Sequence, residues 1–306
     1  MIEPTEDLFK IATGKDVFYT FFVDVGYLIQ AEKYPELIGD VELVKNQITK
    51  MISLGHDVQL HIHPHWEKAI WKDGEWEMNI NGSYKLSDFK LNEIARIVKS
   101  YKSYLDKLIG RKTIAFRSGG WCIQPFGKLI DVFKEVGLKI ESSVFQGGYL
   151  QTENYSFDFR LAPVKSKYQF EDDVCQEVEN GTFTEFPIAS FRYNPLFFWR
   201  LYILGKIFPS KYKMIGDGEF ISQGGRKKQI LTSYTTYHVS TDGYYATKLK
   251  QGLQKSQNIG HNEMVIIGHP KGNTKDSIKR LDLFVSENCK EHNFTTFDRL
   301  NNQNFI

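Results

Sequence analysis

Three histidines stand within five residues of this chain, at His61, His63 and His65. Neutral imidazole binds zinc and similar divalent metals, and a catalytic site of this kind typically uses three protein ligands and leaves one position for water. Pro64 fixes φ and lacks an amide proton, so we expect the chain to turn there and bring His61 and His65 onto one ion. The pattern indicates a metal-dependent enzyme; the alternative is a polar loop rich in histidine by chance.

The segment leading into the histidines has the alternation of a half-buried strand, because Val58, Leu60 and Ile62 are separated by polar residues. Similar strand patterns alternate with helical ones along the chain. This repetition favours parallel strands, and the number of units suits a single (β/α) barrel. The predicted strands are 17–24, 57–63, 113–117, 138–144, 183–188, 229–238, 264–269 and 294–297, and the predicted helices are 41–54, 86–109, 126–136, 242–257 and 274–288.

Polar residues follow most of the predicted strands. In parallel βα barrels the active site lies at the carboxyl ends of the strands, so these residues should gather on one rim. A chance sequence is not expected to place an aspartate, an arginine and several histidines there together. The candidates at strand ends, besides the histidine cluster, are Asp24, Arg117 with Gly119, Gly120 and Trp121 after it, Glu141, His238 and His269.

Composition narrows the functional classes. The chain has 306 residues, with 39 basic and 37 acidic side chains and a formal net charge of +2, so nothing in its charge points to nucleic acid as a partner. We predict one domain over residues 1–306. The three cysteines, at positions 122, 175 and 289, fit reduced thiols, and the acidic N-terminus lacks the features of a secretory signal. Both observations favour a cytoplasmic protein of unknown oligomeric state.

One apolar and aromatic segment, residues 195–209, includes Arg200 and Lys206. It is too short to span a bilayer. The first interpretation is a helix buried in the fold or lining a cleft. The second is an interfacial helix that makes peripheral contact with the inner membrane surface, since aromatic residues with basic neighbours suit that boundary.

Taken together, these motifs and their order resemble the polysaccharide deacetylase family, the metal-dependent esterases of carbohydrate esterase family four. Members of that family fold as a distorted, often incomplete, (β/α) barrel. The version seen here looks most like the deacetylase-like proteins associated with surface-glycan and O-antigen biosynthesis. The resemblance is carried by residues 22–26 (FVDVG), 55–65 (GHDVQLHIHPH), 116–121 (FRSGGW), 140–144 (IESSV) and 266–270 (IIGHP).

The resemblance implies hydrolysis of an N-acetyl group on a sugar of a surface glycan or its precursor. The expected cytoplasmic location and the apolar segment 195–209 favour a precursor carried on a lipid or a nucleotide. It also implies one divalent metal, with zinc favoured, held by Asp24, His61 and His65. A metal lowers the pKa of water and polarises the amide carbonyl, and a protonated histidine gives its proton to the leaving amine. We expect His269 to be that acid.

This chain departs from the family at its first motif. The family has two adjacent aspartates there, a general base and a metal ligand, whereas here Asp24 is followed by Val25. A single carboxylate must either bind the metal or act as the base. We assign Asp24 to the metal, although by position it aligns better with the base. The base is then left among His269, His63 and Glu141.

Several residues are candidates for substrate contact or positioning. An arginine fork at this rim could orient the base or bind substrate, and the alternative is a structural salt bridge. Glycines let the backbone approach a ligand or form a tight turn, and tryptophan suits the apolar face of a sugar. Asp73-Gly74, between Trp71 and Trp76, predicts a hairpin turn near the site. The candidates are Arg117, Gly119, Gly120, Trp121, Trp66 and His238.

Two other classes stay open. A catalytically inactive, carbohydrate-binding relative would keep the cleft and the aromatic residues, and the missing second aspartate favours it. Another metallohydrolase on the same barrel, such as a deformylase or a phosphoesterase, would keep the same ligands. A phosphoesterase should have more basic residues around the site than Arg117 and Lys271.

Overall fold

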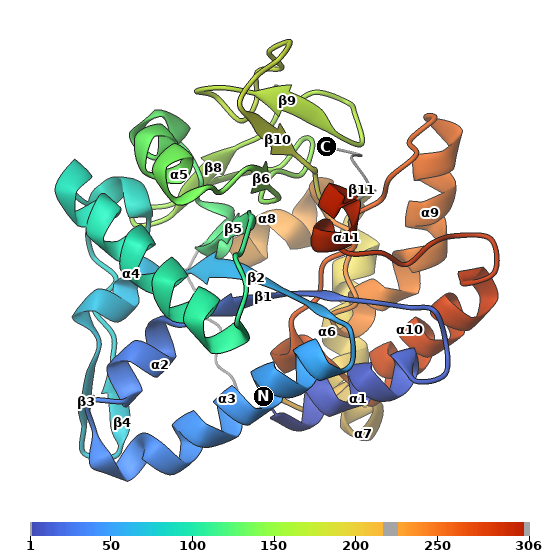
Figure 1. Ribbon diagram of the computed structural model, residues 1–306. Helices are drawn as coiled ribbons and strands as arrows, with labels where there is room; N and C mark the ends of the chain where they lie inside the picture. The colour runs from blue at the N-terminus through green and yellow to red at the C-terminus, as the bar shows by residue number, and fades with distance from the viewer. Residues whose placement is uncertain (1, 217–225, 303–306) are drawn as a thin grey trace.

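The computed structural model of this chain describes residues 2–216 and 226–302. Its centre is a six-stranded sheet in the order β1-β2-β5-β6-β10-β9 (Figure 1). Five of these strands pair in parallel, and β9 pairs with β10 in the antiparallel direction. The predicted α/β class with a mostly parallel sheet is therefore confirmed. The strands are β1 Thr20–Asp24, β2 Asp57–Ile62, β5 Ala115–Ser118, β6 Ile140–Glu141, β10 Phe183–Glu185 and β9 Tyr168–Phe170.

Beyond β10 the strand pairing is reduced to single bridges. Ile188 bridges Val265, and Ser240 bridges Ile267, both in the parallel sense. The predicted strands 264–269 and 294–297 are thus represented only by isolated pairs, the second by a bridge between Val17 and Phe294. These bridges do not extend the sheet as further paired strands, and the barrel stays a prediction.

Helices cover the sheet where apolar residues recur at helical spacing. In α4, Ile94, Ile97, Tyr101 and Leu105 are buried, and the helix ends at Gly110 with φ of 70°. Helices α3 and α4 pack against β2 (Figure 1). The helices are α1 Ile2–Ala12, α2 Gly26–Ala31, α3 Ile38–Ser53, α4 Leu91–Ile109, α5 Ile130–Val136, α6 Pro195–Ile207, α7 Pro209–Tyr212, α8 Arg226–Thr232, α9 Leu249–Asn258, α10 Lys275–Asn288 and α11 Phe297–Asn302.

The predicted strand 229–238 is only half correct. Its first part lies in α8, and only β12, Thr235–His238, is extended, pairing with β11, Ser190–Tyr193. The apolar side chains of Ile230 and Leu231 pack with those of α6, so tertiary contact and not strand alternation explains their spacing. Sequence patterns also gave no sign of the hairpin formed by β7, Tyr149–Gln151, and β8, Ser156–Asp158.

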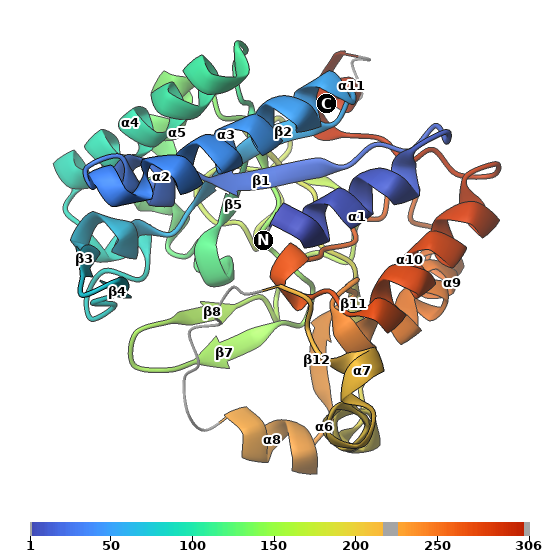
Figure 2. The same cartoon turned by 90° about the horizontal axis from the view of Figure 1, so that it is seen from below.

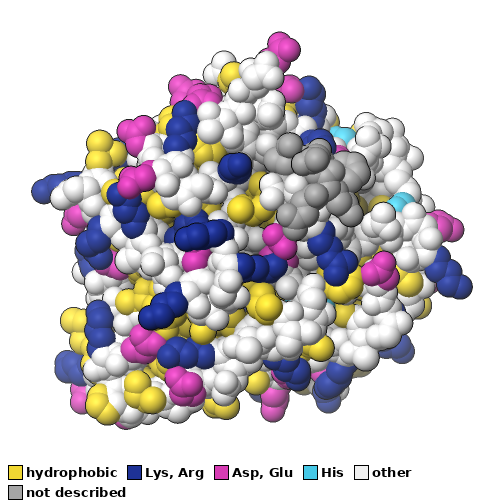
Figure 3. Space-filling model, viewed as in Figure 1, with side chains coloured by type: hydrophobic (Ala, Val, Ile, Leu, Met, Phe, Trp, Pro, Cys, Tyr) yellow, Lys and Arg dark blue, Asp and Glu magenta, His cyan; other side chains and the backbone are white. Residues whose placement is uncertain are grey.

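The predicted hairpin turn at Asp73-Gly74 is confirmed. It joins β3, Ile70–Lys72, to β4, Glu75–Glu77, and both turn residues have positive φ, 53° and 83°. Basic and acidic side chains are interspersed over the face of the molecule shown in Figure 3, as the nearly balanced composition indicates.

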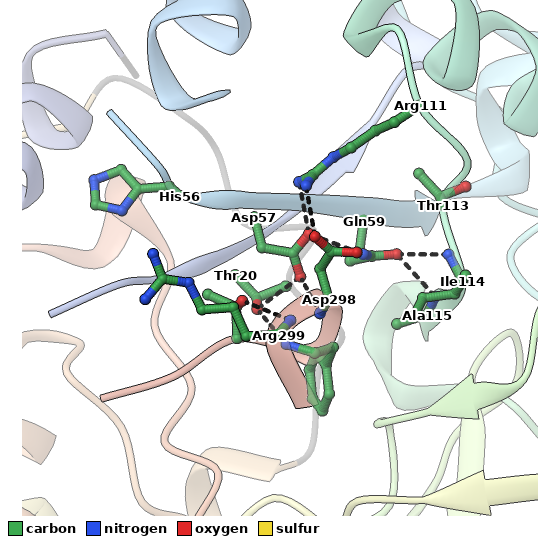
Figure 4. A network of polar contacts seen from close by, with 12 residues as sticks. Thr20, His56, Asp57, Gln59, Arg111, Thr113, Ile114, Ala115, Asp298 and Arg299 are labelled. Atoms are coloured by element: carbon green, nitrogen blue, oxygen red, sulfur yellow. Dashed lines mark hydrogen bonds and ion pairs between the residues drawn. The ribbon is translucent and has the colours of Figure 1, made fainter. Parts of the chain in front are cut away.

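A buried carboxylate joins the amino ends of the strands to the end of the chain (Figure 4). Asp57, at the start of β2, accepts hydrogen bonds from Thr20 Oγ1 at 3.1 Å, Gln59 Nε2 at 2.9 Å and Arg111 Nη2 at 2.9 Å. Its Oδ2 also accepts from the backbone N–H of Asp298 in α11. One side chain therefore links β1, β2, the loop before β5 and the last helix.

Replacement of Asp57 by alanine should destabilise the fold by about 1 to 3 kcal/mol. It removes the acceptor of Thr20 and Gln59 and one of the two carboxylate partners of Arg111. Urea unfolding measures the change. Lys112→Ala, from the same loop and with a side chain 86% exposed, is the control and should shift the free energy of unfolding by under about 0.5 kcal/mol. Equal stability of both variants would contradict this role of Asp57.

His56 should make stability depend on pH. Its ring stacks on Phe9 at 5.4 Å, and burial, with a smaller contribution from the Arg299 charge, lowers its pKa from 6.5 to about 4. In the unfolded chain His56 takes up a proton as the pH falls below 6.5, whereas in the folded chain it stays neutral until about pH 4. The contribution of His56 to the free energy of unfolding is therefore complete above pH 6.5. It is lost by about 1.4 kcal/mol per pH unit as the pH falls toward 4. NMR titration of His56 tests this; a pKa near 6.5 in the folded protein would refute it.

Candidate active site

Asp24, the last residue of β1, is held by three donors. Its Oδ1 accepts the backbone N–H of Gly26 at 2.9 Å, and its Oδ2 accepts the backbone N–H of His63 at 3.2 Å. The ring of His63 lies with Nδ1 2.9 Å from the same oxygen, and we assign the proton to Nδ1 because a carboxylate can only accept. Burial raises the pKa of Asp24, while nearby His61 lowers it to a smaller extent.

A second aspartate and histidine form a matching pair. His269 donates to Asp242 with its backbone N–H at 2.6 Å and with ring Nδ1 at 2.7 Å. Burial favours a higher pKa for Asp242, but the His269 contacts outweigh it and lower that pKa. We had expected residue 242 only as the start of a helix. The available signal was an acidic residue just beyond a strand that already ends in His238.

The Asp24–His63 and Asp242–His269 pairs lie close enough for their charges to interact. Burial is the main cause that lowers the pKa of His63, and the charges of Lys271 and His269 lower it further. The ring of Trp121 lies 6.3 Å from that of His269. Strand ends far apart in sequence are thus brought together at one edge of the sheet, as the parallel pattern predicts.

The histidine cluster contains donors suited to a metal. His61 Nδ1 lies 2.6 Å from the carbonyl oxygen of Arg117, which must accept, so Nε2 is the unprotonated nitrogen. His65 Nδ1 is buried with no hydrogen-bond partner among the described residues. Burial lowers the pKa of His61 and His63 to about 3 and that of His65 to about 4. All three imidazoles are therefore neutral near pH 7, the form that binds metal ions.

The positions of these side chains differ from our expectation. Across residues 2–216 and 226–302, no three His, Cys, Asp or Glu side chains are placed so that they could share an ion. Neither Asp24 with His61 and His65 nor the three histidines together form such a set as they stand, and the Asp24 carboxylate is hydrogen-bonded to His63. The donor chemistry fits a divalent metal, and the side chains would have to draw together to hold one.

Arg117 lies below the cluster and does not orient Asp24. It donates from Nε to the carbonyl oxygen of Ser142 at 2.6 Å and from Nη2 to Ser142 Oγ at 2.9 Å. Burial lowers its pKa to about 10, against the opposing charges of Glu141 and Glu185. Burial raises the pKa of Glu185, and Glu141 raises it further. Arg117 and Glu141 therefore belong to a group of interacting polar side chains inside the protein. The third member, Glu185, lies within β10, and no pattern in the sequence predicted its role.

The two glycines make room for neighbouring side chains. A Cβ on Gly119 would lie 2.5 Å from Cδ2 of His63, and one on Gly120, where φ is +59°, would lie 2.7 Å from the hydroxyl of Tyr84. That their backbone also approaches a substrate stays a prediction. Gly119 lets the His63 ring pack directly on the chain.

The aromatic candidates lie in two separate clusters, one around Trp121 and one around Trp66. Trp121, in a positive-φ conformation, lies with its ring 4.9 Å from that of His238, which is only 2% exposed. His238 thus packs against the Trp121 ring from a buried position. Trp66 packs edge-on against Trp76 at 5.1 Å and is part of an aromatic cluster beside the hairpin. Trp121 is the aromatic candidate whose ring contacts a member of the pairs, His269.

No family model matches the sequence, and no curated protein matches it. Among solved structures, the chain is similar to a Mycobacterium smegmatis protein provisionally described as a polysaccharide deacetylase, with a TM-score of 0.51 and 15% identity over 98% of this chain and 76% of that one. It is also similar to a GH57 branching enzyme from Thermococcus kodakaraensis, solved with glucose, with a TM-score of 0.52 and 9% identity. That match covers 99% of this chain and 65% of the enzyme. At these identities the likeness establishes a shared fold.

The Asp242 pair should fix the tautomer of His269. In the wild type, 15N NMR should show the proton on Nδ1, because Oδ2 of Asp242 accepts it. Asp242→Ala should shift the ring toward the Nε2-protonated form, with the signals of His56 as an internal control. A wild-type ring protonated on Nε2 would contradict the assigned contact.

Proposed function

We propose that this protein is a metal-dependent carbohydrate N-deacetylase, acting on an N-acetylated sugar of a surface glycan or its precursor. The observation that carries the proposal is the meeting of two Asp-His pairs beside a cluster of neutral histidines. The shared fold with a provisionally described polysaccharide deacetylase supports it. The O-antigen type and the cytoplasmic location belong to the proposal.

We assign the metal, one divalent ion with zinc favoured, to His61, His63 and His65. Histidine ligands usually donate their second ring N–H to a carbonyl or a carboxylate, and His61 and His63 do so here, to Arg117 and Asp24. Asp24 thereby becomes the residue that orients His63 instead of a ligand, a change from our sequence-based assignment. When bound, the ion would lower the pKa of water and polarise the acetyl carbonyl.

His269 carries the proton transfers. Its Nδ1 is engaged by Asp242, so Nε2 is the nitrogen that can accept a proton from the attacking water as the new carbon–oxygen bond forms. The same nitrogen then returns the proton to the leaving amine as the carbon–nitrogen bond breaks, and acetate and the free amino sugar result. Asp242 stabilises the imidazolium in between, since its carboxylate is ionised.

Two further side chains complete the proposed site. Lys271 is close enough to influence both His63 and His65, and its positive charge would stabilise the negative oxygen of the tetrahedral intermediate. Burial lowers the pKa of Lys271, with Asp242 opposing this. Trp121 offers an apolar ring surface beside His269 for one face of the sugar.

A carbohydrate-binding relative without activity is the second candidate function. Val25, which stands where the resembling family has its second aspartate, has a fully buried side chain within the hydrophobic core. It supplies no polar group to the site. Binding of sugar without turnover would favour this second function.

The test is acetate release from N-acetylated sugars presented as free oligosaccharide, nucleotide-linked sugar and lipid-linked sugar, with and without added zinc. We expect zinc-dependent release, reduced about 100-fold or more in His269→Ala. His292→Ala, a histidine outside the site that contacts Gln257, is the matched control and should retain full activity. Release of formate alone from N-formyl sugars would favour a deformylase, and absence of release from every substrate would refute the proposal.

A further inference from the structure

Helix α6 is apolar on two sides. Its buried side carries Phe197 and Phe198, whose rings contact Tyr193 and Tyr245. The opposite side carries large apolar residues at spacings of three and four, so they form one stripe along the helix. They are Leu196, Trp199, Ile203 and Ile207, with exposed fractions of 55%, 49%, 48% and 61%.

Further exposed apolar side chains follow α6 in the sequence. Phe208 is 52% exposed and Met214 50%, and Tyr234, beyond α8, is 61% exposed. Seven of the eighteen large apolar side chains that are exposed in the described part of the chain therefore lie within residues 195–234. Contiguous apolar surface of this kind usually marks a contact with another molecule.

The surroundings of the stripe are basic. Residues 188–241 contain eight basic residues and two acidic ones, Asp217 and Glu219. Arg192 and Lys227 lie over the rings of Tyr234 and Tyr202, at 4.8 Å and 4.9 Å from their centres, so cations flank aromatic rings on this surface. The other basic residues of this segment include Arg200, Lys206, Lys211, Lys213 and Lys228, of which Lys211 pairs with Asp276 in α10.

These elements form one edge of the molecule. Figure 2 shows α6, α7 and α8 together beside β11 and β12, away from the helices that cover β1 and β2. No helix in residues 2–216 or 226–302 is long and apolar enough to cross a bilayer. An apolar stripe with aromatic residues and a basic border is instead typical of a helix that lies in the plane of a membrane surface.

We infer that the exposed stripe of α6, with Phe208 and Met214, docks on an anionic lipid surface. The apolar side chains enter the boundary between headgroups and acyl chains, and the basic border faces the anionic headgroups. The aromatic packing of α6 continues through Tyr245 to Tyr237, 5.6 Å away, and Tyr237 contacts Trp121 at 5.9 Å. The docking surface and Trp121 are thus connected through one cluster of packed aromatic rings. The inference does not depend on the chemistry proposed above.

The test is co-sedimentation of the full chain with phosphatidylcholine vesicles that contain or lack phosphatidylglycerol. We expect binding to the anionic vesicles that weakens with salt. Ile203→Ser combined with Ile207→Ser should weaken binding roughly tenfold or more, since both side chains leave the lipid. Arg200→Gln combined with Lys206→Gln should weaken it several-fold and reduce the salt dependence.

Leu43→Ser combined with Leu161→Ser is the matched control, because these residues are 57% and 88% exposed on other parts of the surface. It should bind like the wild type, and urea unfolding should show that all variants are folded. Absence of binding to anionic vesicles, or equal loss in the control, would overturn the inference. So would a dimer in sedimentation velocity that the Ile203 and Ile207 variant converts to monomer, since a second copy would then cover the stripe.

Discussion

The hydrogen bond between His63 and the buried carboxylate of Asp24 is the contact on which the site depends. A carboxylate removed from water is unfavourable unless donors surround it, and Asp24 has both a ring and two backbone N–H groups. These donors join the end of β1 to the turn after β2. Because Nδ1 of His63 is engaged, its other nitrogen faces away from Asp24. The same contact fixes where His63 packs, directly over Gly119.

Hydrogen bonds at both the amino and the carboxyl ends of the strands hold the sheet in the geometry that the His63–Asp24 contact needs. At the amino ends, Asp57 joins β1 and β2 to α11 through buried hydrogen bonds. At the carboxyl ends, the backbone carbonyl of Arg117 accepts a hydrogen bond from the ring of His61. The guanidinium of Arg117 donates to Ser142 and lies close to the charges of Glu141 and Glu185. Polar side chains buried in this way need nearly every hydrogen bond satisfied, and that requirement restricts the conformations of the strands that carry them.

Sequence reasoning identified the site residues that follow strands, because strand alternation locates strand ends. Asp24, His61 and His269 were predicted as candidates in this way. Asp242 was missed because its role arises from pairing with a residue 27 positions later, a contact that no local pattern contains. The close packing of the His63 ring beside Gly119 could not be predicted, since sequence does not show which side chain fills the space next to a glycine. The strand assigned to Ile230 and Leu231 was wrong because packing against α6, and not alternation, explains their apolar character.

The measurement that tests the account most directly is zinc affinity at equilibrium for the wild type and three variants. The account predicts one zinc per chain, loss of binding in His63→Ala, and only about 10- to 100-fold weaker binding in Asp24→Asn, because Asp24 orients a ligand without being one. His56→Ala, at the start of the same strand, should bind like the wild type. No zinc in the wild type, or full affinity in His63→Ala with complete loss in Asp24→Asn, would contradict it.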